Sequence, residues 1–334
     1  MDAFEEDPQV SDAFISEFPK LFSNKTGKYK GDPIRIHVKQ DAVPVIQASR
    51  RIPMHYINPT KSEIERMLKE DIIEGPINIE EPGTFLSNLV ITEKKEKGAI
   101  RVTLDCQAVN KEIHRTHEPI PTVEELRHKF KGSEVLSSVD MTNCYHQFEI
   151  EDRARKLFAF RTPWGIFQYK RMVMGTSPAK RIREMIKDCP NAVHFKDDIV
   201  VHGTRENHDG YLRQALSELQ KKGITLRPDK CHLRKKEVKW FGYIFSKSGM
   251  STDPDKCAII KEWPRPKSGK EVKSFLQTVQ FNAKFLGGTN SDDSYPVLTE
   301  PLRNLTKKNS TFIWGTTDRN LSMRSGRGSE ARKS

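Results

Sequence analysis

Three aspartates lie at positions where their carboxylates could bind metal ions. Asp140 ends the apolar run VLSSVD, and Asp197 and Asp198 lie between the apolar arms of AVHFKDDIVVHG. If the first strand lies beside that hairpin, three carboxylates converge and can hold two hard divalent cations, Mg²⁺ above all with Mn²⁺ as an alternative. Such a cation pair stabilises the attacking and leaving oxygens of an in-line phosphoryl displacement.

A structural alternative stays open for the Asp197-Asp198 pair. Ordinary β-turns favour aspartate, so an Asp-Asp turn taken alone is more often structural. An apolar hairpin with adjacent carboxylates is harder to explain in that way, because like charges repel unless a cation neutralises them.

Short strands and hairpins must position these residues. The pattern predicts a strand over 135–140 and a strand-turn-strand unit over 192–203. Two further hairpins are expected, one over 85–105 around the polar turn EKKEKG and one over 156–171 that turns at Pro163-Trp164-Gly165. Short strands are also expected at 224–226 and 238–245.

Helices are predicted from capping pairs and apolar periodicity. Thr60 with Glu63, and Thr122 with Glu125, have capping-box spacing. The first of these helices should end before Gly75-Pro76. Other helices are expected over 181–187, 207–222 and 270–285, the second with Leu212, Ala215, Leu216 and Leu219 facing inward. The alternation of strands and helices predicts an α+β fold with an antiparallel centre.

Charge and cysteine usage narrow the class of protein. The net charge of +12 favours a polyanionic partner, although a basic surface without a particular partner explains it too. The five cysteines are scattered, and Cys231-His232 does not match a zinc ligand pattern. With no secretory signal and no apolar run of membrane-spanning length, an intracellular protein of the cytoplasm or nucleus is expected, without a membrane partner.

Several blocks in order resemble the reverse transcriptase of Ty3/gypsy-type LTR retrotransposons, the polymerase region of the Pol polyprotein. They are VDMTNCYHQF, FKDD, GITLRPDKC and WFGYIFS, within a resemblance over roughly residues 18–315. The resemblance implies a right-hand polymerase with fingers, palm and partial thumb or connection. It implies RNA-directed DNA synthesis with deoxynucleoside triphosphates on a primed RNA or DNA template, and a homodimer is compatible with it. The expected regions are a tether at 1–50, fingers and start of palm at 51–134, palm at 135–247, thumb or connection at 248–315 and a disordered tail at 316–334.

The resemblance also assigns roles around the aspartates. Asp140 and Asp197 become the main metal ligands, and Asp198 completes the site. Tyr145 resembles the side chain that supports the incoming sugar and excludes a 2′-hydroxyl, with a core tyrosine as the alternative. Lys230 matches a lysine near the departing pyrophosphate, where an acid helps, although it could be an ordinary surface charge.

Nucleotide and primer contacts follow from other blocks. The segment KKEKGAIRVTLDCQAVNK resembles the fingers hairpin, with Arg101 on the triphosphate and Lys94 or Lys95 on the outer phosphates. The remaining residues implied by the resemblance are Gly175 at the nucleotide, Phe195 where the family has tyrosine, and Trp240, Phe241 and Gly242 at the primer end.

One block departs from the family. VMGTSPA at 173–179 runs directly into KRIREMI, so about one helical turn is missing from the template-side helix. Neither a protease motif, a ribonuclease H set nor an integrase region is recognisable, which suggests a truncated or degenerate copy. The alternative function is therefore a catalytically inactive nucleic-acid-binding remnant, and a protein-interaction scaffold is a more distant one.

Overall fold

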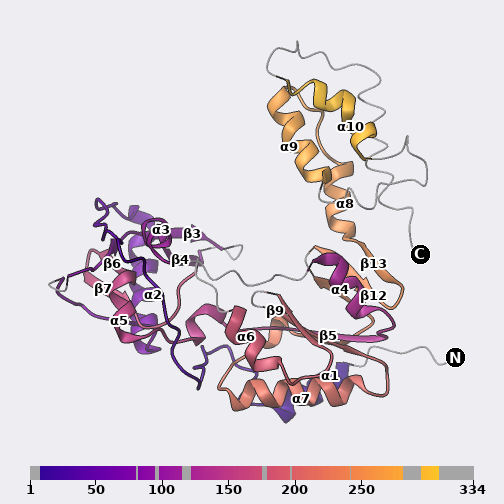
Figure 1. The fold of residues 1–334 in the computed structure, drawn as a ribbon, viewed down its shortest axis with the longest axis horizontal. Coiled ribbons are helices and arrows are strands. Elements are labelled where there is room, and N and C mark those ends of the chain that lie inside the picture. Colours follow the sequence, from indigo (N-terminus) through magenta and orange to yellow (C-terminus); the bar gives the residue numbers. More distant parts are fainter. Residues whose placement is uncertain are drawn as a thin grey trace. The chain divides into compact units, whose positions relative to one another are not determined.

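Two compact units make up the chain (Figure 1). The computed structural model describes residues 8–79, 82–94, 98–114, 122–174, 179–195, 198–240, 242–280 and 295–307. The first unit comprises Met1–Pro121 and Ser137–Arg234, and the second comprises Thr122–Leu136 and Lys235–Ser334.

The first unit contains most of the helices and three of the sheets. Its helices are α1 (Pro8–Glu17), α2 (Ile57–Lys69), α3 (Gln107–Glu112), α5 (Asp152–Arg155), α6 (Ala179–Ile186) and α7 (His208–Lys221). Short 3-10 turns are η1 (Met54–Tyr56), η2 (Cys144–Gln147), η3 (Lys156–Phe158) and η4 (Pro228–Lys230). Its strands are β1 (Ile73–Glu74), β2 (Leu86–Ser87), β3 (Leu89–Glu93), β4 (Ile100–Leu104), β5 (Val135–Asp140), β6 (Ala159–Thr162), β7 (Gly165–Tyr169), β8 (Ala192–Phe195), β9 (Asp198–Gly203) and β10 (His232–Lys235).

Three sheets organise these strands. One has the order β1-β7-β6-β2, with β2 parallel to β6 and the other pairs antiparallel. The hairpin β3–β4 is a second sheet, in which Thr92 pairs with Arg101. The third has the order β10-β5-β9-β8, so the strand that ends at Asp140 lies beside the strand that begins at Asp198. The predicted α+β class with an antiparallel centre follows from this arrangement.

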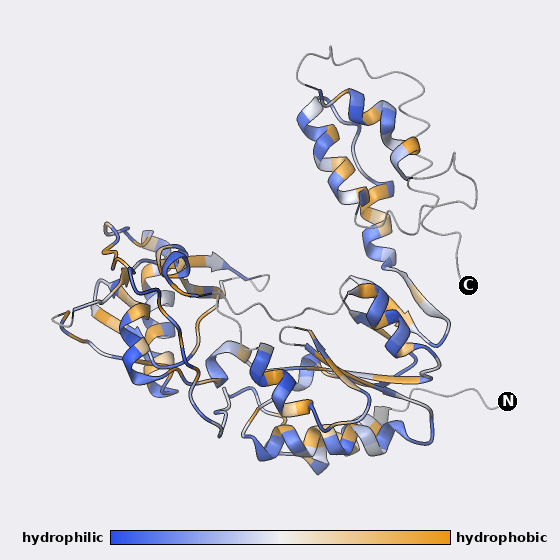
Figure 2. Ribbon diagram, in the orientation of Figure 1, coloured by the Kyte–Doolittle hydropathy of each residue, from blue (hydrophilic) through white to orange (hydrophobic). Residues whose placement is uncertain are grey.

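Helix α7 covers the third sheet through one apolar face. Its Leu212, Ala215, Leu216 and Leu219 are each at most 1% exposed, as the helical periodicity predicts, and α7 packs on β9. Hydrophilic and hydrophobic residues alternate along this helix (Figure 2). The buried face anchors the sheet that carries Asp140.

The second unit is a small sheet and a group of helices. Its elements are α4 (Val123–Phe130), β11 (Glu237–Trp240), β12 (Tyr243–Ser246), β13 (Gly249–Thr252), α8 (Pro254–Lys261), α9 (Gly269–Gln280) and α10 (Tyr295–Asn304). The three strands form an antiparallel sheet in chain order. At the start of α4, Thr122 accepts from the Glu125 amide while Glu125 accepts from the Thr122 amide, which confirms the predicted capping box.

Three local predictions differ from the structure. Helix α2 begins at Ile57, and Thr60 is a buried residue inside it, so the predicted capping box at Thr60 and Glu63 is wrong. Residues 224–226 form no strand, only isolated bridges from Leu226. The N-terminal segment at 1–50, expected to be a tether, contains helix α1 in its described part, and Phe14 and Leu21 belong to the core.

Other predicted elements are confirmed. Both predicted hairpins and the strand over 135–140 are present, and the expected helix at 270–285 appears as α9, with residues 281–285 outside the described part. Within the described ranges, no helix combines the length and apolar character needed to span a bilayer.

The α7 interface predicts a measurable stability difference. Leu216→Ala should lower the free energy of unfolding by about 2–5 kcal/mol, because it leaves a cavity under the sheet. Leu68→Ala, on the partly exposed face of α2, should cost far less. Urea unfolding followed by circular dichroism measures both, and equal losses would contradict the burial of α7 against the sheet.

Candidate active site

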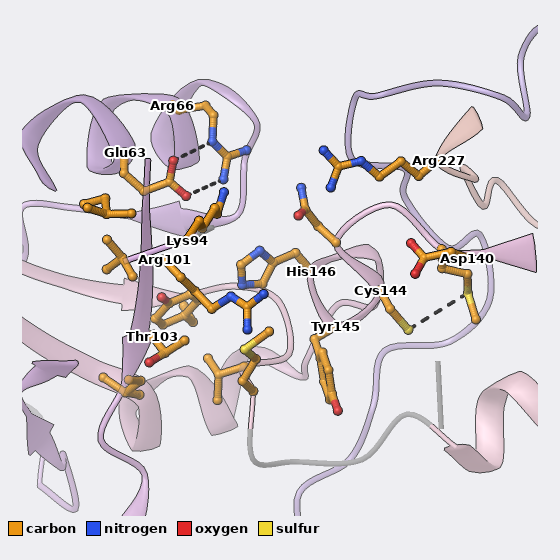
Figure 3. A pocket seen from close by; sticks show the side chains of 18 of the residues that line it. Glu63, Arg66, Lys94, Arg101, Thr103, Asp140, Cys144, Tyr145, His146 and Arg227 are labelled. Atoms are coloured by element: carbon orange, nitrogen blue, oxygen red, sulfur yellow. Dashed lines mark hydrogen bonds and ion pairs between the residues drawn. The ribbon is translucent and has the colours of Figure 1, made fainter. Parts of the chain in front are cut away.

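A cavity of about 180 Å³ in the first unit collects side chains from distant parts of the sequence. Figure 3 shows the side chains of α2, the β3–β4 hairpin, the end of β5 and η2 around it. The residues that line it include Glu63, Arg66, Lys94, Arg101, Thr103, Asp140, Cys144, Tyr145, His146, Tyr169, Arg227 and Lys230. Five of the sequence-predicted site residues therefore meet in one cavity, namely Lys94, Arg101, Asp140, Tyr145 and Lys230.

Asp140 is held at the rim of this cavity by its backbone. The Arg227 amide donates to the Asp140 carbonyl oxygen at 2.9 Å, and Met141 forms an antiparallel bridge with Leu226. The side chain of Asp140 is 28% exposed, and its Oδ2 lies 3.8 Å from Lys230 Nζ. Because Lys230 is half-exposed, this ion pair adds little stability. It leaves both charges accessible to a ligand.

Asp198 lies on the strand beside Asp140. Ser137, early in β5, is 3.1 Å from the ring of His208, which follows the end of β9. The early part of β5 is therefore near the far end of β9, and this indicates that Asp140 and Asp198 lie at the same end of the sheet. Asp197 lies outside the described residues, and among the described residues no group of three His, Cys, Asp or Glu side chains could hold a metal ion. The meeting of all three carboxylates stays a prediction.

The β3–β4 hairpin supplies cations to the cavity. Arg101 lies on β4, and Lys94 follows β3, where its amide donates to the Ala99 carbonyl and closes the hairpin end. Both side chains line the cavity, whereas Lys95 lies outside the described residues. A guanidinium and an ammonium on one short hairpin suit the oxygens of a phosphate chain.

Tyr145 enters the cavity on a turn whose geometry is fixed by its neighbours. Asn143, immediately before η2, has a left-handed φ of 47°, and its side chain donates to Thr26 at 3.0 Å. The fully buried Gln147 amide donates to the carbonyls of Thr142 and Thr225 at 2.7 and 2.9 Å. These bonds hold Tyr145, which is partly buried against the core and lines the cavity.

Arg66 and His146 line the cavity but were not among the predicted site residues. Arg66 lies 2.7 Å from both Glu63 and Glu70, so its charge is balanced by carboxylates of its own helix and neighbouring turn. Burial, assisted by the charge of Arg66, lowers the pKa of His146 to about 4. His146 is therefore neutral near pH 7. The approach of Arg66 to η2, which contains His146, is a tertiary contact that no local spacing reveals.

The charge of the cavity is mostly positive. Lys94, Arg101, Arg227 and Lys230 line it, and its acidic lining residues are Glu63, which pairs with Arg66, and Asp140, which pairs with Lys230. A bound ligand with several phosphate oxygens would relieve the repulsion among these cations.

The expected primer-end residues have mixed positions. Phe195 ends β8 and pairs with Asp198 across the hairpin, where it is partly buried. Trp240 is buried in the second unit and packs against Phe130 and Phe245, with ring centroids 5.8 and 6.3 Å apart. Gly242 follows with a φ of 73° in the turn between β11 and β12. Gly175 and Phe241 lie outside the described residues, and the roles given to all of these residues stay predictions.

The middle of the chain matches a known protein family. The family described as "Reverse transcriptase (RNA-dependent DNA polymerase)" matches residues 92–245. An uncharacterised protein of Caenorhabditis elegans is 27% identical over 288 residues, covering 83% of this chain and 22% of that protein. The Tf2-3 transposon polyprotein of Schizosaccharomyces pombe is 26% identical over 296 residues, covering 86% of this chain and 21% of the polyprotein. The chain thus spans about a fifth of the length of these relatives.

Solved structures show the fold. A foamy viral protease-reverse transcriptase in complex with double-stranded DNA superposes with a TM-score of 0.83 at 18% identity, covering 96% of this chain and 57% of that one. The foamy viral enzyme in complex with an RNA/DNA hybrid gives 0.80 at 18% identity, covering 99% of this chain and 44% of that one. The predicted α+β polymerase fold is confirmed.

His146 predicts a pH dependence of stability. In the unfolded chain its pKa is about 6.5, so protons bind the unfolded state first as the pH falls, and the free energy of unfolding should decrease from pH 7 toward pH 5. His146→Gln should make this decrease shallower, as measured by urea unfolding at each pH. An identical slope in both proteins would contradict a buried neutral imidazole.

Proposed function

We propose that the chain, whose residues 92–245 match the reverse transcriptase family and which is similar to a retrotransposon polyprotein, is an RNA-directed DNA polymerase that adds deoxynucleotides to a primer 3′ end. The observation that carries the proposal is the cavity in which Asp140 lies among Lys94, Arg101, Tyr145 and Lys230. This set combines a metal-binding carboxylate, cations for a triphosphate and an aromatic ring for a sugar. The fingers, palm and thumb boundaries expected above remain part of this proposal.

Divalent cations are the proposed cofactors, since residues 92–245 match the reverse transcriptase family, which generally uses divalent metal ions. Asp140 and Asp198 offer hard carboxylate oxygens from neighbouring strands, which suits Mg²⁺ or Mn²⁺. With Asp197 they would hold the two ions. When bound, the ions lower the pKa of the primer hydroxyl and neutralise charge on the phosphates.

The residues of the chain then have defined tasks in the transfer. The primer 3′ oxygen attacks the α-phosphorus, a new P–O bond forms, the bond to the oxygen shared with the β-phosphate breaks, and the hydroxyl proton is released. Arg101 and Lys94 hold the triphosphate oxygens, and Tyr145 lies under the sugar. Lys230, 3.8 Å from Asp140, is near enough to the same centre to protonate the departing pyrophosphate.

A primed template is the proposed macromolecular partner. The net charge of +12 favours a polyanion, and binding should weaken with salt because phosphates release counterions. The foamy viral structures contain double-stranded DNA or an RNA/DNA hybrid, which supports a duplex partner for the shared fold. A homodimer stays a prediction.

One observation favours a second candidate, a nucleic-acid-binding remnant without activity. Helix α6 has only 8 residues, in agreement with the shortened block seen in the sequence. A missing turn changes which residues of a helix face a ligand. This candidate predicts binding of primer-template duplex without extension.

Asp140→Asn should abolish primer extension. With Mg²⁺, a primed RNA template and deoxynucleoside triphosphates, we expect a loss of at least about 1000-fold, because the carboxylate charge is needed for the cations. Asp188→Asn, at an aspartate that is 82% exposed, is the matched control and should retain activity. Extension that survives in Asp140→Asn would overturn the assignment. Duplex binding without extension in the unsubstituted chain would favour the remnant.

Tyr145→Val should relax selection against ribonucleotides. The smaller side chain leaves space for a 2′-hydroxyl, so the ratio of kcat/KM for deoxynucleotides to that for ribonucleotides should fall by about 10- to 100-fold. Single-nucleotide extension with each substrate measures the ratio. An unchanged ratio would indicate that Tyr145 is only a core residue.

A further inference from the structure

A closed ring of four polar side chains lies on the far face of β5 from Asp140. Ser137 Oγ is 3.1 Å from His208 Nε2, and His208 Nδ1 is 3.1 Å from Asp209 Oδ1. Arg234 Nε forms an ion pair with the same carboxylate oxygen at 3.1 Å but makes no hydrogen bond within the described residues, and the Arg234 amide donates to Ser137 Oγ at 2.8 Å. The ring therefore joins β5, the start of α7 and β10.

The contacts determine where the protons lie. The carboxylate of Asp209 accepts, so His208 Nδ1 donates to it and Nε2 of the neutral ring accepts from the Ser137 hydroxyl. Burial lowers the pKa of His208, although the hydrogen bond and the charge of Asp209 act in the opposite direction. The imidazole is therefore neutral near pH 7. Each polar group of Ser137 and His208 then has a partner, as a buried polar ring requires.

The same residue types form nucleophilic triads in hydrolases, but burial excludes that chemistry here. Ser137 and His208 are both 0% exposed, so a substrate has no access to the hydroxyl. Ser137 and His208 therefore have either a structural role or a positioning role. Arg234 favours positioning, because it adopts a left-handed φ of 50° that costs free energy in a residue with a side chain.

The ring lies on β5 and β10, close along the chain to two residues that line the cavity, Asp140 and Lys230. Ser137 precedes Asp140 on β5, and side chains of odd and even residues point to opposite faces of a strand, so the ring and the carboxylate lie on opposite faces. Arg234 follows shortly after η4, which ends at Lys230. The ring therefore joins β5 to β10 through Ser137 and Arg234. Ser137 shortly precedes Asp140 along the chain, and Arg234 shortly follows Lys230.

We propose that Ser137, His208, Asp209 and Arg234 are positioning residues that set the distance between Asp140 and Lys230. This proposal rests on the proposed function for its catalytic consequence, but its structural consequence is independent of activity. Loss of the ring should loosen the end of β5, where the Arg227 amide is bonded to the Asp140 carbonyl oxygen.

A pair of substitutions at His208 separates positioning from bulk stability. His208→Leu removes the acceptor for the Ser137 hydroxyl, whereas His208→Gln retains an acceptor in its amide oxygen. Thr162→Ala is the matched control, since it removes a buried hydroxyl that donates at 2.8 Å to the Gly165 carbonyl in another sheet.

Hydrogen exchange of the Arg227 amide is the activity-independent measurement. In His208→Leu we expect its exchange to accelerate by about tenfold or more, with amides of the β6–β7 hairpin unchanged. His208→Gln should restore most of the protection, and Thr162→Ala should leave Arg227 unaffected. Equal protection of Arg227 in the unsubstituted chain and His208→Leu would overturn the proposal, whether or not the chain polymerises.

Primer extension gives the catalytic arm. In His208→Leu, kcat should fall by about 10- to 100-fold with little change in the KM for primer-template, and His208→Gln should recover most of it. A loss that tracks the melting temperature across all three variants would overturn positioning in favour of a purely structural ring. An unsubstituted chain that fails to extend a primer contradicts the proposed function alone, and the exchange of Arg227 still decides the role of the ring.

Discussion

The pairing of β5 with β9 is the constraint on which the whole site depends. β5 ends at Asp140 and β9 begins at Asp198, so hydrogen bonds between the two strands decide how far apart two acidic side chains lie. Carboxylates on adjacent strands repel each other, and burial of apolar residues from α7 against β9 compensates for that cost. The stable part of the sheet would thus hold the proposed arrangement, in which cations neutralise the two carboxylates.

The cations in and around the cavity fall into two groups, those that stabilise the fold and those that could bind a ligand. Arg66 is balanced by Glu63 and Glu70, and Arg171 donates to four backbone carbonyl groups, so these cations serve the fold. Arg101 and Lys230 lie in the same region with far less compensation among the described contacts. The charge left over is what a nucleoside triphosphate would need.

Local patterns in the sequence were sufficient for much of this fold. The turn EKKEKG between apolar runs predicted the β3–β4 hairpin, the run ending at Asp140 predicted β5, and periodicity predicted the buried face of α7. The predicted capping box at Thr60 is wrong because helix α2 starts at Ile57 and Thr60 is buried inside it. Pro59 did not prevent this earlier start, because proline is tolerated in the first turn of a helix.

The site itself was only partly predictable. The resemblance to retrotransposon polymerases named Asp140, Arg101, Tyr145 and Lys230, which share one cavity. His146 and Arg227 lie within the blocks VDMTNCYHQF and GITLRPDKC but were given no role, and neither the approach of Arg66 to the cavity nor the ring around His208 was predicted, because these contacts join segments far apart in the sequence. Such contacts depend on the tertiary packing of the sheet and helices, which composition and spacing do not encode one residue at a time.

Anomalous diffraction from crystals grown with Mn²⁺, primer-template duplex and a non-hydrolysable deoxynucleotide would test the central claim most directly. The account predicts anomalous peaks at coordination distance from the carboxylates of both Asp140 and Asp198, with the phosphates of the nucleotide beside them. Peaks confined to other carboxylates, or an Asp140 side chain that points away from Asp198, would contradict it.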